Sequence, residues 1–98
     1  MRYQFQWDPS KARSNLDKHK VNFRTAEGVF KDPMAMTLFD EENSWTEERW
    51  ITLGMTPSGQ HLLVVHTVEE YRDVIDVRII SARRATRQEI RRYQEGQL

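Results

Sequence analysis

The stretch of residues 76–93 reads D-V-R-I-I-S-A-R-R-A-T-R-Q-E-I-R-R-Y and decides the fold of this chain. It opens with a run of β-branched apolar residues, a composition typical of a buried strand. Thr86 and Glu89 follow at the spacing of a capping box, in which each side chain binds the backbone amide of the other residue and so starts a helix. The stretch therefore predicts a strand over residues 74–82 that leads into a helix over residues 86–95.

Six arginines fall within this stretch, although the chain as a whole carries a formal net charge of zero. Two acidic groups, residues 40–42 and residues 47–48, lie in the middle of the chain. Such a separation of charge suits a protein that binds a polyanion at one surface and a basic partner at another. Both runs could equally be solvated faces, so charge alone does not decide between binding and solubility.

The composition bounds the class of protein. A chain of 98 residues is long enough for one hydrophobic core, so we treat residues 1–98 as a single domain. It has no cysteine, which excludes disulfides and thiolate chemistry, and its three histidines show no zinc pattern, so we expect no metal and no cofactor. No apolar run approaches the roughly 20 residues of a membrane span, and a signal-peptide core is missing. We therefore expect a cytoplasmic protein without membrane contact.

The remaining elements follow from local signals. In chain order they are a strand around Tyr3, Phe5 and Trp7, a helix over residues 9–19, a short helix over residues 26–30 capped by Thr25, and strands over residues 34–39, 49–55 and 60–67. Asp8 suits the N-cap of the first helix, and Pro9 suits its first position, where no amide donor is needed. Residues 56–59 form the turn of an antiparallel hairpin, and residues 68–73 either extend its second strand or connect it to the next.

This order predicts an α+β domain, with two N-terminal helices and one C-terminal helix packed on a mainly antiparallel β-sheet. The helices should cover one face of the sheet. The other face should be partly open, and it is then the default binding surface.

Two motifs near the ends of the chain are more specific than any single element. Residues 7–23 follow the pattern W-D-x-x-K-x-x-x-N-x-x-K-H-x-V-x-F, and residues 78–83 read R-I-I-S-A-R. Other matching positions are Asp32-Pro33, Glu48-Arg49, Gly54, Val65-His66, Ala85, Glu89 and Tyr93. In these positions the chain resembles the BrnT family of toxins over nearly its whole length. It departs from the family at Lys20, where glycine is common, and in a longer connection over residues 67–76.

The resemblance implies a RelE-like fold and a ribonuclease toxin of a type II toxin–antitoxin system, with RNA as substrate. It also implies a partner, a BrnA-type antitoxin with a ribbon-helix-helix DNA-binding module that neutralises the toxin. Operator DNA would be bound only indirectly, through the antitoxin, and the two proteins could form a higher-order toxin–antitoxin oligomer. The sequence leaves one alternative open, a non-catalytic toxin-like interaction module that binds an antitoxin or another DNA-binding partner.

RNA can be cleaved without a metal when its 2′-OH attacks the adjacent phosphate, which requires a base, an acid and stabilisation of the charged intermediate. Arginine suits the last role because its planar fork can bind two phosphate oxygens. We expect Arg78, Arg83 and Arg84 to bind phosphate, and Arg83 to be catalytic because it belongs to the closing motif. Flanking the helix cap or binding the antitoxin is the alternative role for Arg83 and Arg84.

Two histidines are candidates for the acid or the base, because the imidazole titrates near neutral pH. His66 shares a strand face with Leu62 and Val64, so it could instead be a hydrogen-bonded core histidine. His19 ends the first helix, and a plain helix-end residue is its alternative.

The remaining candidates are Lys18, Glu48 and Arg49 for catalysis, Lys20 for RNA binding, and Trp45, Arg87 and Arg91 for partner binding. Glu48 and Arg49 are neighbours in an extended segment, so only one of the two side chains can line a site. The ribonuclease hypothesis requires residues 18–20 to fold against residues 76–93.

Overall fold

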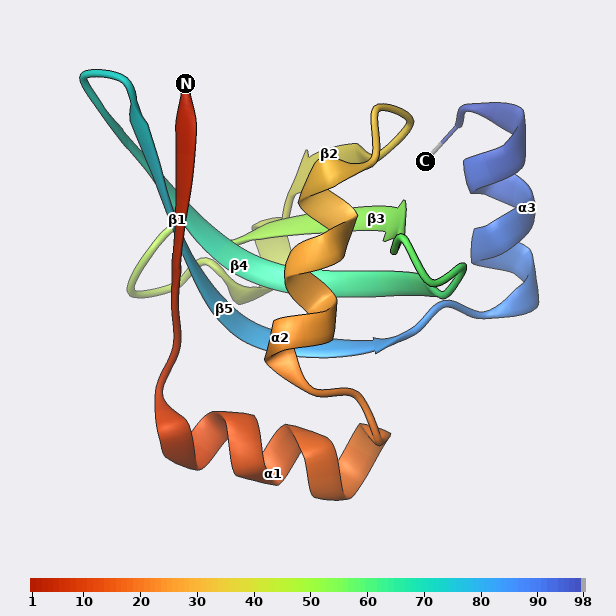
Figure 1. The fold of residues 1–98 in the computed structure, drawn as a ribbon, viewed down its shortest axis with the longest axis horizontal. Coiled ribbons are helices and arrows are strands. Elements are labelled where there is room, and N and C mark those ends of the chain that lie inside the picture. Colours follow the sequence, from red (N-terminus) through yellow and green to blue (C-terminus); the bar gives the residue numbers. More distant parts are fainter. Residues whose placement is uncertain (98) are drawn as a thin grey trace.

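A computed structural model describes residues 1–97 and places five strands in one sheet, in the order β1-β5-β4-β3-β2. The strands are β1 (Arg2–Gln6), β2 (Met36–Phe39), β3 (Trp50–Met55), β4 (His61–Tyr71) and β5 (Val74–Arg84). The helices are α1 (Pro9–His19), α2 (Phe23–Ala26) and α3 (Arg87–Glu95), with 3₁₀ helices η1 (Glu27–Lys31) and η2 (Glu41–Asn43). All neighbouring strands are antiparallel except β1, which runs parallel to β5 (Figure 1). The α+β class and the mainly antiparallel sheet are confirmed.

The predicted pair of N-terminal helices is wrong. Only α1 lies at the start of the chain, while α2 runs directly into η1 and crosses one face of the sheet (Figure 1). This helix begins at Phe23 rather than at residue 26, because the side chain of Asn22 accepts the amide of Thr25 at 2.7 Å and caps it earlier. Both Asn22 and Thr25 are good caps, so the local sequence did not separate them.

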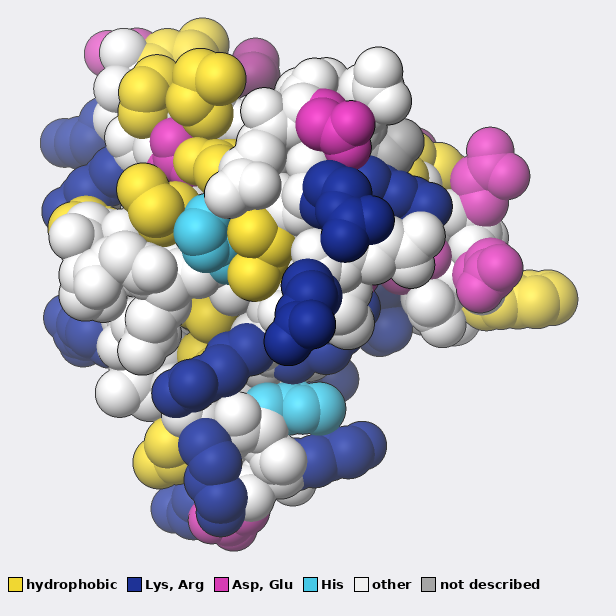
Figure 2. Space-filling model, turned by 90° about the vertical axis from the view of Figure 1, so that its right-hand side faces the viewer, with side chains coloured by type: hydrophobic (Ala, Val, Ile, Leu, Met, Phe, Trp, Pro, Cys, Tyr) yellow, Lys and Arg dark blue, Asp and Glu magenta, His cyan; other side chains and the backbone are white. Residues whose placement is uncertain are grey.

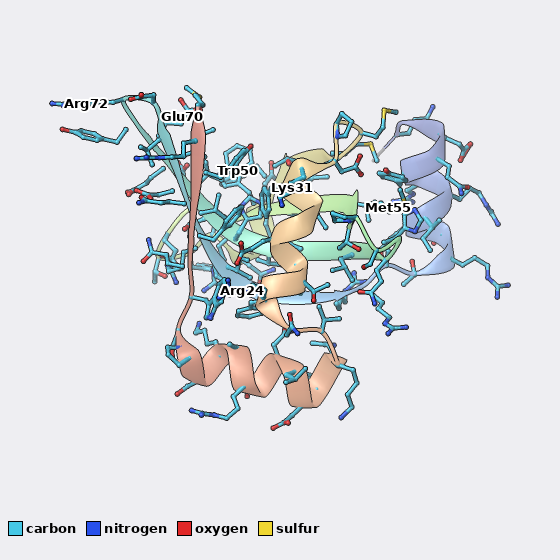
Figure 3. All side chains as sticks on the ribbon, viewed as in Figure 1. Arg24, Lys31, Trp50, Met55, Glu70 and Arg72 are labelled. Atoms are coloured by element: carbon cyan, nitrogen blue, oxygen red, sulfur yellow. The ribbon has the colours of Figure 1, made fainter. Side chains whose placement is uncertain are left out.

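β4 and β5 form one long hairpin, and no long loop connects them. Tyr71 pairs with Val74, so only Arg72 and Asp73 form the turn, and Arg72 takes the left-handed φ of 59°. Residues 68–71 therefore extend β4, which was one of the two predicted alternatives. The tip, with Glu70 and Arg72, projects from the body of the molecule at the far side from α3 (Figure 3).

The sheet has a covered face and an open face. The buried core lies between the sheet and α2 with η1, and it comprises Val21, Phe23, Ala26, Val29, Leu62, Val64, Val77, Ile79 and Ala82. Full burial of a side chain of this size contributes about 1.5–3 kcal/mol, so this layer is the main source of stability. Gly54 on β3 permits the close approach of η1, because a Cβ there would lie 3.1 Å from the Cβ of Val29.

The open face carries Arg78, Ser81 and Arg83 of β5, all of them half-buried. The expectation that all helices cover one face is wrong, because α3 packs on this second face at one end of the sheet. There the Tyr93 ring contacts His61, and the Tyr93 hydroxyl donates to Asp32 at 2.5 Å. Among the described residues, no helix is long and apolar enough to cross a membrane.

Candidate active site

Arg78 and Arg83 lie on the same face of β5, although their spacing predicts otherwise. They stand five residues apart, and in a regular strand an odd spacing directs two side chains to opposite faces. On β4, however, their partners are Thr67 and Leu63, which are four residues apart and share a face. Directly paired residues lie on the same side of an antiparallel sheet, so both arginines point to the open face.

A β-bulge at Ile80 is the reason that the two arginines share a face. The β4 neighbours Val65 and His66 pair with Ser81 and Ile79, which leaves Ile80 without a partner. Bulges recur beside active sites because the extra residue re-aims the side chains that follow it. Without this residue the strand beyond it would turn Arg83 toward the core.

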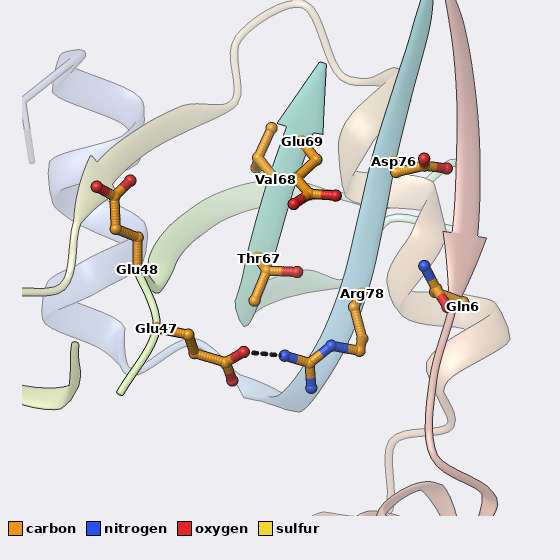
Figure 4. A pocket seen from close by; sticks show the side chains of 8 residues that line it. All are labelled: Gln6, Glu47, Glu48, Thr67, Val68, Glu69, Asp76 and Arg78. Carbon is orange, nitrogen blue, oxygen red and sulfur yellow. Dashed lines mark hydrogen bonds and ion pairs between the residues drawn. The ribbon is translucent and has the colours of Figure 1, made fainter. Parts of the chain in front are cut away.

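Arg78 is held by Glu47, from the segment that precedes β3. The Arg78 guanidinium donates to the Glu47 carboxylate (Figure 4), and the Arg49 guanidinium lies 3.7 Å from the other Glu47 oxygen. The hydrogen bond from Arg78 lowers the pKa of Glu47, with further contributions from the charges of Arg78 and Arg49. Among residues 1–97, the buried Nε of Arg49 has no hydrogen-bond partner, so this arginine keeps one unused donor.

Glu47, rather than the predicted Glu48, is the glutamate that contacts the arginines. Both border a hollow of ≈ 440 Å³, but Figure 4 shows the Glu47 carboxylate directed at Arg78 and the Glu48 carboxylate directed away from it. The sequence held the signal for this difference. Glu47 and Arg49 are two residues apart just before β3, and the alternation of side chains along an extended chain would place them on one side and Glu48 on the other.

Arg83 is oriented by α3. Its two terminal nitrogens donate to the two carboxylate oxygens of Glu89 at 2.8 and 2.9 Å. This hydrogen-bonded pair lowers the pKa of Glu89 to about 2 and raises the pKa of Arg83. Glu89 also accepts the amide of Thr86, which completes the predicted capping box. Within the described chain the Nε of Arg83 makes no hydrogen bond, so one edge of the fork is left for an anion.

α1 is tied to β5 by a single buried side chain, Asn15. β1 pairs only with residues 74–78 of β5, so the backbone of Ala82 has no strand on that side. Asn15 takes the place of a strand: its Nδ2 donates to Ala82 O at 2.8 Å and to Val21 O at 2.9 Å, and its Oδ1 accepts the Ala82 amide at 3.0 Å. One amide side chain thus makes the hydrogen bonds that a neighbouring strand would make with Ala82, and it fixes α1 beside β5.

The end of α1 consequently lies against the open part of β5. Lys18 and His19 line a hollow of ≈ 280 Å³ with Ser81, so residues 18–19 and the R-I-I-S-A-R motif do come together. Lys20 follows in the left-handed conformation, with φ 61° and ψ 28°, and its amide bonds to Leu16 O. The chain keeps the backbone conformation that glycine would favour at this position.

Other candidates lie elsewhere. His66 is 1% exposed on the covered face, with Nε2 at 2.6 Å from the Thr52 hydroxyl and its ring against Phe30, and burial lowers its pKa. This is the environment of the core histidine that the sequence left as an alternative. Arg84 pairs with Leu62, so it is exposed on the opposite face from the phosphate-binding candidates of β5.

The surface around α3 is basic. Figure 2 looks onto this end of the molecule, and it shows lysine and arginine side chains spread from α3 toward α1. Exposed cations include Lys18, Lys20, Arg84, Arg87 and Arg91. The structure leaves the predicted roles of Arg87 and Arg91 in partner binding as predictions. Trp45 is 90% exposed in the loop after η2.

Known proteins resemble this chain in sequence and in fold. Residues 7–89 match a family model described as the ribonuclease toxin, BrnT, of type II toxin–antitoxin systems. The 1.1 Å crystal structure of the Brucella abortus ribonuclease toxin BrnT superposes with a TM-score of 0.60 at 19% identity, over 89% of this chain and 99% of that chain. At this identity the structural likeness concerns the fold. No curated protein matches the chain.

Proposed function

The chain belongs to the BrnT family of ribonuclease toxins from type II toxin–antitoxin systems, and on this premise we propose that it is a metal-independent endoribonuclease with its site on the open face. One observation carries the proposal. The bulge at Ile80 gathers Arg78, Ser81 and Arg83 on one face, and Asn15 holds the end of α1 beside them. Cations and a histidine from the two family motifs therefore border a single surface.

The proposed reaction is attack by the 2′-oxygen of RNA on the adjacent phosphorus. The 2′-OH loses its proton to a base, the P–O5′ bond breaks, and the leaving 5′-oxygen takes a proton. We assign one of the two proton transfers to His19, since imidazole can act in either direction near neutral pH. Arg83, through its free Nε edge, binds the reacting phosphate and stabilises the charge that develops on it, and Arg78 binds another phosphate of the RNA backbone.

The other residues have supporting roles in this proposal. Glu47 positions both Arg78 and Arg49 through ion pairs. Lys18 and Lys20 attract the RNA backbone at the end of α1. Glu48 stays at the rim of the hollow, and His66 and Arg84 are left out because they face away.

We propose a BrnA-type ribbon-helix-helix antitoxin as the partner, since a type II toxin implies an antitoxin. We propose that the antitoxin neutralises the toxin in the cytoplasm, where the RNA substrate is found. We also propose that the fold is RelE-like.

A non-catalytic interaction module is the second candidate, and one observation favours it. Both Arg78 and Arg83 are already paired with glutamates, so a phosphate must share or displace an existing partner. In the interaction module these ion pairs would be purely structural, and the basic surface would serve only to bind the antitoxin.

Cleavage of RNA by the purified protein in the presence of EDTA separates the two candidates. We expect cleavage, and we expect Arg83→Ala to slow it at least about tenfold, the effect of removing one donor to the developing charge. Loss of activity on adding EDTA, or no cleavage by the wild type, would contradict the proposal.

Two further variants show whether Arg83 acts directly. Glu89→Gln also breaks the ion pair but keeps Arg83, so it should retain more activity than Arg83→Ala if the arginine binds RNA itself. Arg72→Ala at the hairpin tip removes an exposed arginine far from α3 and should cleave like the wild type. Equal losses in Arg83→Ala and Glu89→Gln would assign the effect to the ion pair instead.

A further inference from the structure

The chain has an acidic edge that the proposed ribonuclease site does not explain. Between Asp32 and Glu48 there are six carboxylates and no lysine or arginine. This segment contains β2, η2 and the loop that follows, and β2 is an outer strand of the sheet. Asp40 is buried and Glu47 binds Arg78, but Glu41 and Glu42 are exposed. Their negative charge would repel RNA, so this part of the surface needs another explanation.

Large apolar side chains are exposed along the same segment. Trp45 is 90% exposed, Met34 62% and Leu38 41%. The indole of Trp45 donates to the carbonyl of Glu42 at 2.8 Å, so the ring is oriented on the surface rather than free. Exposed aromatic and apolar side chains that are fixed in place mark protein interfaces, where tryptophan is enriched among the residues that dominate affinity.

The exposed leucine belongs to an apolar row that begins at the edge. Leu38 pairs with Ile51, and Ile51 pairs with Val65, so the three side chains lie side by side on the open face. Ile51 and Val65 are only half-buried. The edge strand thus offers free backbone groups next to an apolar surface.

β2 is short, but it lacks the residues that commonly block an edge strand. Residues Met36–Phe39 contain no charged side chain and no proline, whereas natural edges are commonly blocked by lysine, proline or a covering element. A strand that keeps an open edge is a template for the addition of another strand.

We propose that β2, with Leu38, Trp45 and the carboxylates of Glu41 and Glu42, is the docking surface of the antitoxin. We call it the β2 edge surface. The occupant is an extended antitoxin segment in which lysine or arginine alternates with large apolar side chains, added beside β2 as a sixth strand. Charge complementarity selects such a segment, and its apolar side chains would cover Leu38 and Trp45. This assignment rests on the proposed toxin–antitoxin function for the identity of the partner.

The β2 edge surface is continuous with the proposed site. The loop that carries Trp45 ends at Glu47, which holds Arg78. An antitoxin that binds Trp45 therefore lies next to Glu47 and can displace it from Arg78, the proposed phosphate-binding arginine. Neutralisation then does not require the antitoxin to cover Arg83.

The test measures binding of a BrnA-type antitoxin to the 98-residue chain by calorimetry. Trp45→Ala should weaken binding at least about tenfold. The double variant Glu41→Lys with Glu42→Lys should also weaken it and should reduce its dependence on salt. Tyr71→Ala, which removes a 66% exposed aromatic residue at the hairpin tip, is the matched control and should bind like the wild type.

RNA cleavage by the same variants keeps the two proposals apart. Weaker antitoxin binding with unchanged cleavage supports the β2 edge surface. Weaker binding by a protein that never cleaves RNA supports the surface while contradicting the ribonuclease proposal. Wild-type affinity in both edge variants would overturn the surface. A wild-type dimer that Trp45→Ala converts to monomer, with antitoxin binding unchanged, would also overturn it, because the occupant would then be a second copy of this chain.

Discussion

Replacing Asn15 with alanine should separate the two halves of the candidate site. The substitution removes three hydrogen bonds of 2.8 to 3.0 Å and leaves both backbone groups of Ala82 and the carbonyl of Val21 without partners in a buried position. At about 1 kcal/mol for each bond the loss is about 3 kcal/mol. Alanine is the better helix former, which offsets at most about 0.7 kcal/mol. We therefore expect the free energy of unfolding to fall by roughly 2–3 kcal/mol, or the Tm by on the order of 10 °C.

Urea unfolding followed by circular dichroism measures this loss. Asn22→Ala is the matched control, because Asn22 is exposed and makes one capping bond of 2.7 Å, so its loss should cost only about 1 kcal/mol. Asn15→Asp should be at least as destabilising as alanine at neutral pH, because it buries a charge and loses both donated bonds. If Asn15→Ala were no more destabilising than Asn22→Ala, the tie between α1 and β5 would not depend on this side chain.

Catalysis gives the second measurement on the same variant. Asn15 touches no proposed substrate group, but it positions the helix that carries Lys18 and His19. RNA cleavage by Asn15→Ala should therefore fall even at temperatures where circular dichroism shows the domain folded. Unchanged cleavage by the folded variant would mean that the end of α1 is not part of the site.

Three further outcomes follow from single contacts. Lys20→Gly should stabilise the fold by up to about 1 kcal/mol in urea unfolding, because it relieves the strain of a left-handed residue. Gly54→Ala should destabilise it by about 1–3 kcal/mol, because the added Cβ would press on Val29. Glu89 has a pKa of about 2, below its usual 4.5, so its pair with Arg83 stabilises the fold above pH 4.5 and ceases to do so as the pH falls to about 2. The advantage of wild type over Glu89→Gln, on the order of 1 kcal/mol because Arg83 is 39% exposed, should vanish over that range in acid titrations of stability.

Elements with a strong local signal were predictable from the sequence. The Thr86–Glu89 capping box and the Asp8-Pro9 start of α1 depend on side chains that bind amides within three residues, so neighbouring residues decide them. The parallel pairing of β1 with β5 was not predictable in this way. It joins the first strand of the chain to the last, and no turn or short connection encodes which strands become neighbours.

The candidate site was predictable only in part, for a similar reason. Residue types identified Arg83 and His19 as candidates, because few side chains can bind phosphate or move a proton at neutral pH. The carboxylates that orient the arginines come from distant segments, Glu47 before β3 and Glu89 on α3. Motif matching favoured Glu48, whereas alternation from Arg49 would have favoured Glu47.

The bulge at Ile80 accounts for two odd spacings in β5. Ile79 and Ala82 are both buried although they stand three residues apart, and Arg78 and Arg83 share the open face although they stand five apart. Both odd spacings span the same residue. A regular strand cannot satisfy either one, whereas a single inserted residue satisfies both at once, because it shifts the apolar and the charged series by the same step. The single unpaired residue at position 80 therefore places both arginines of the stretch R-I-I-S-A-R on one face, which is the proposed phosphate-binding surface.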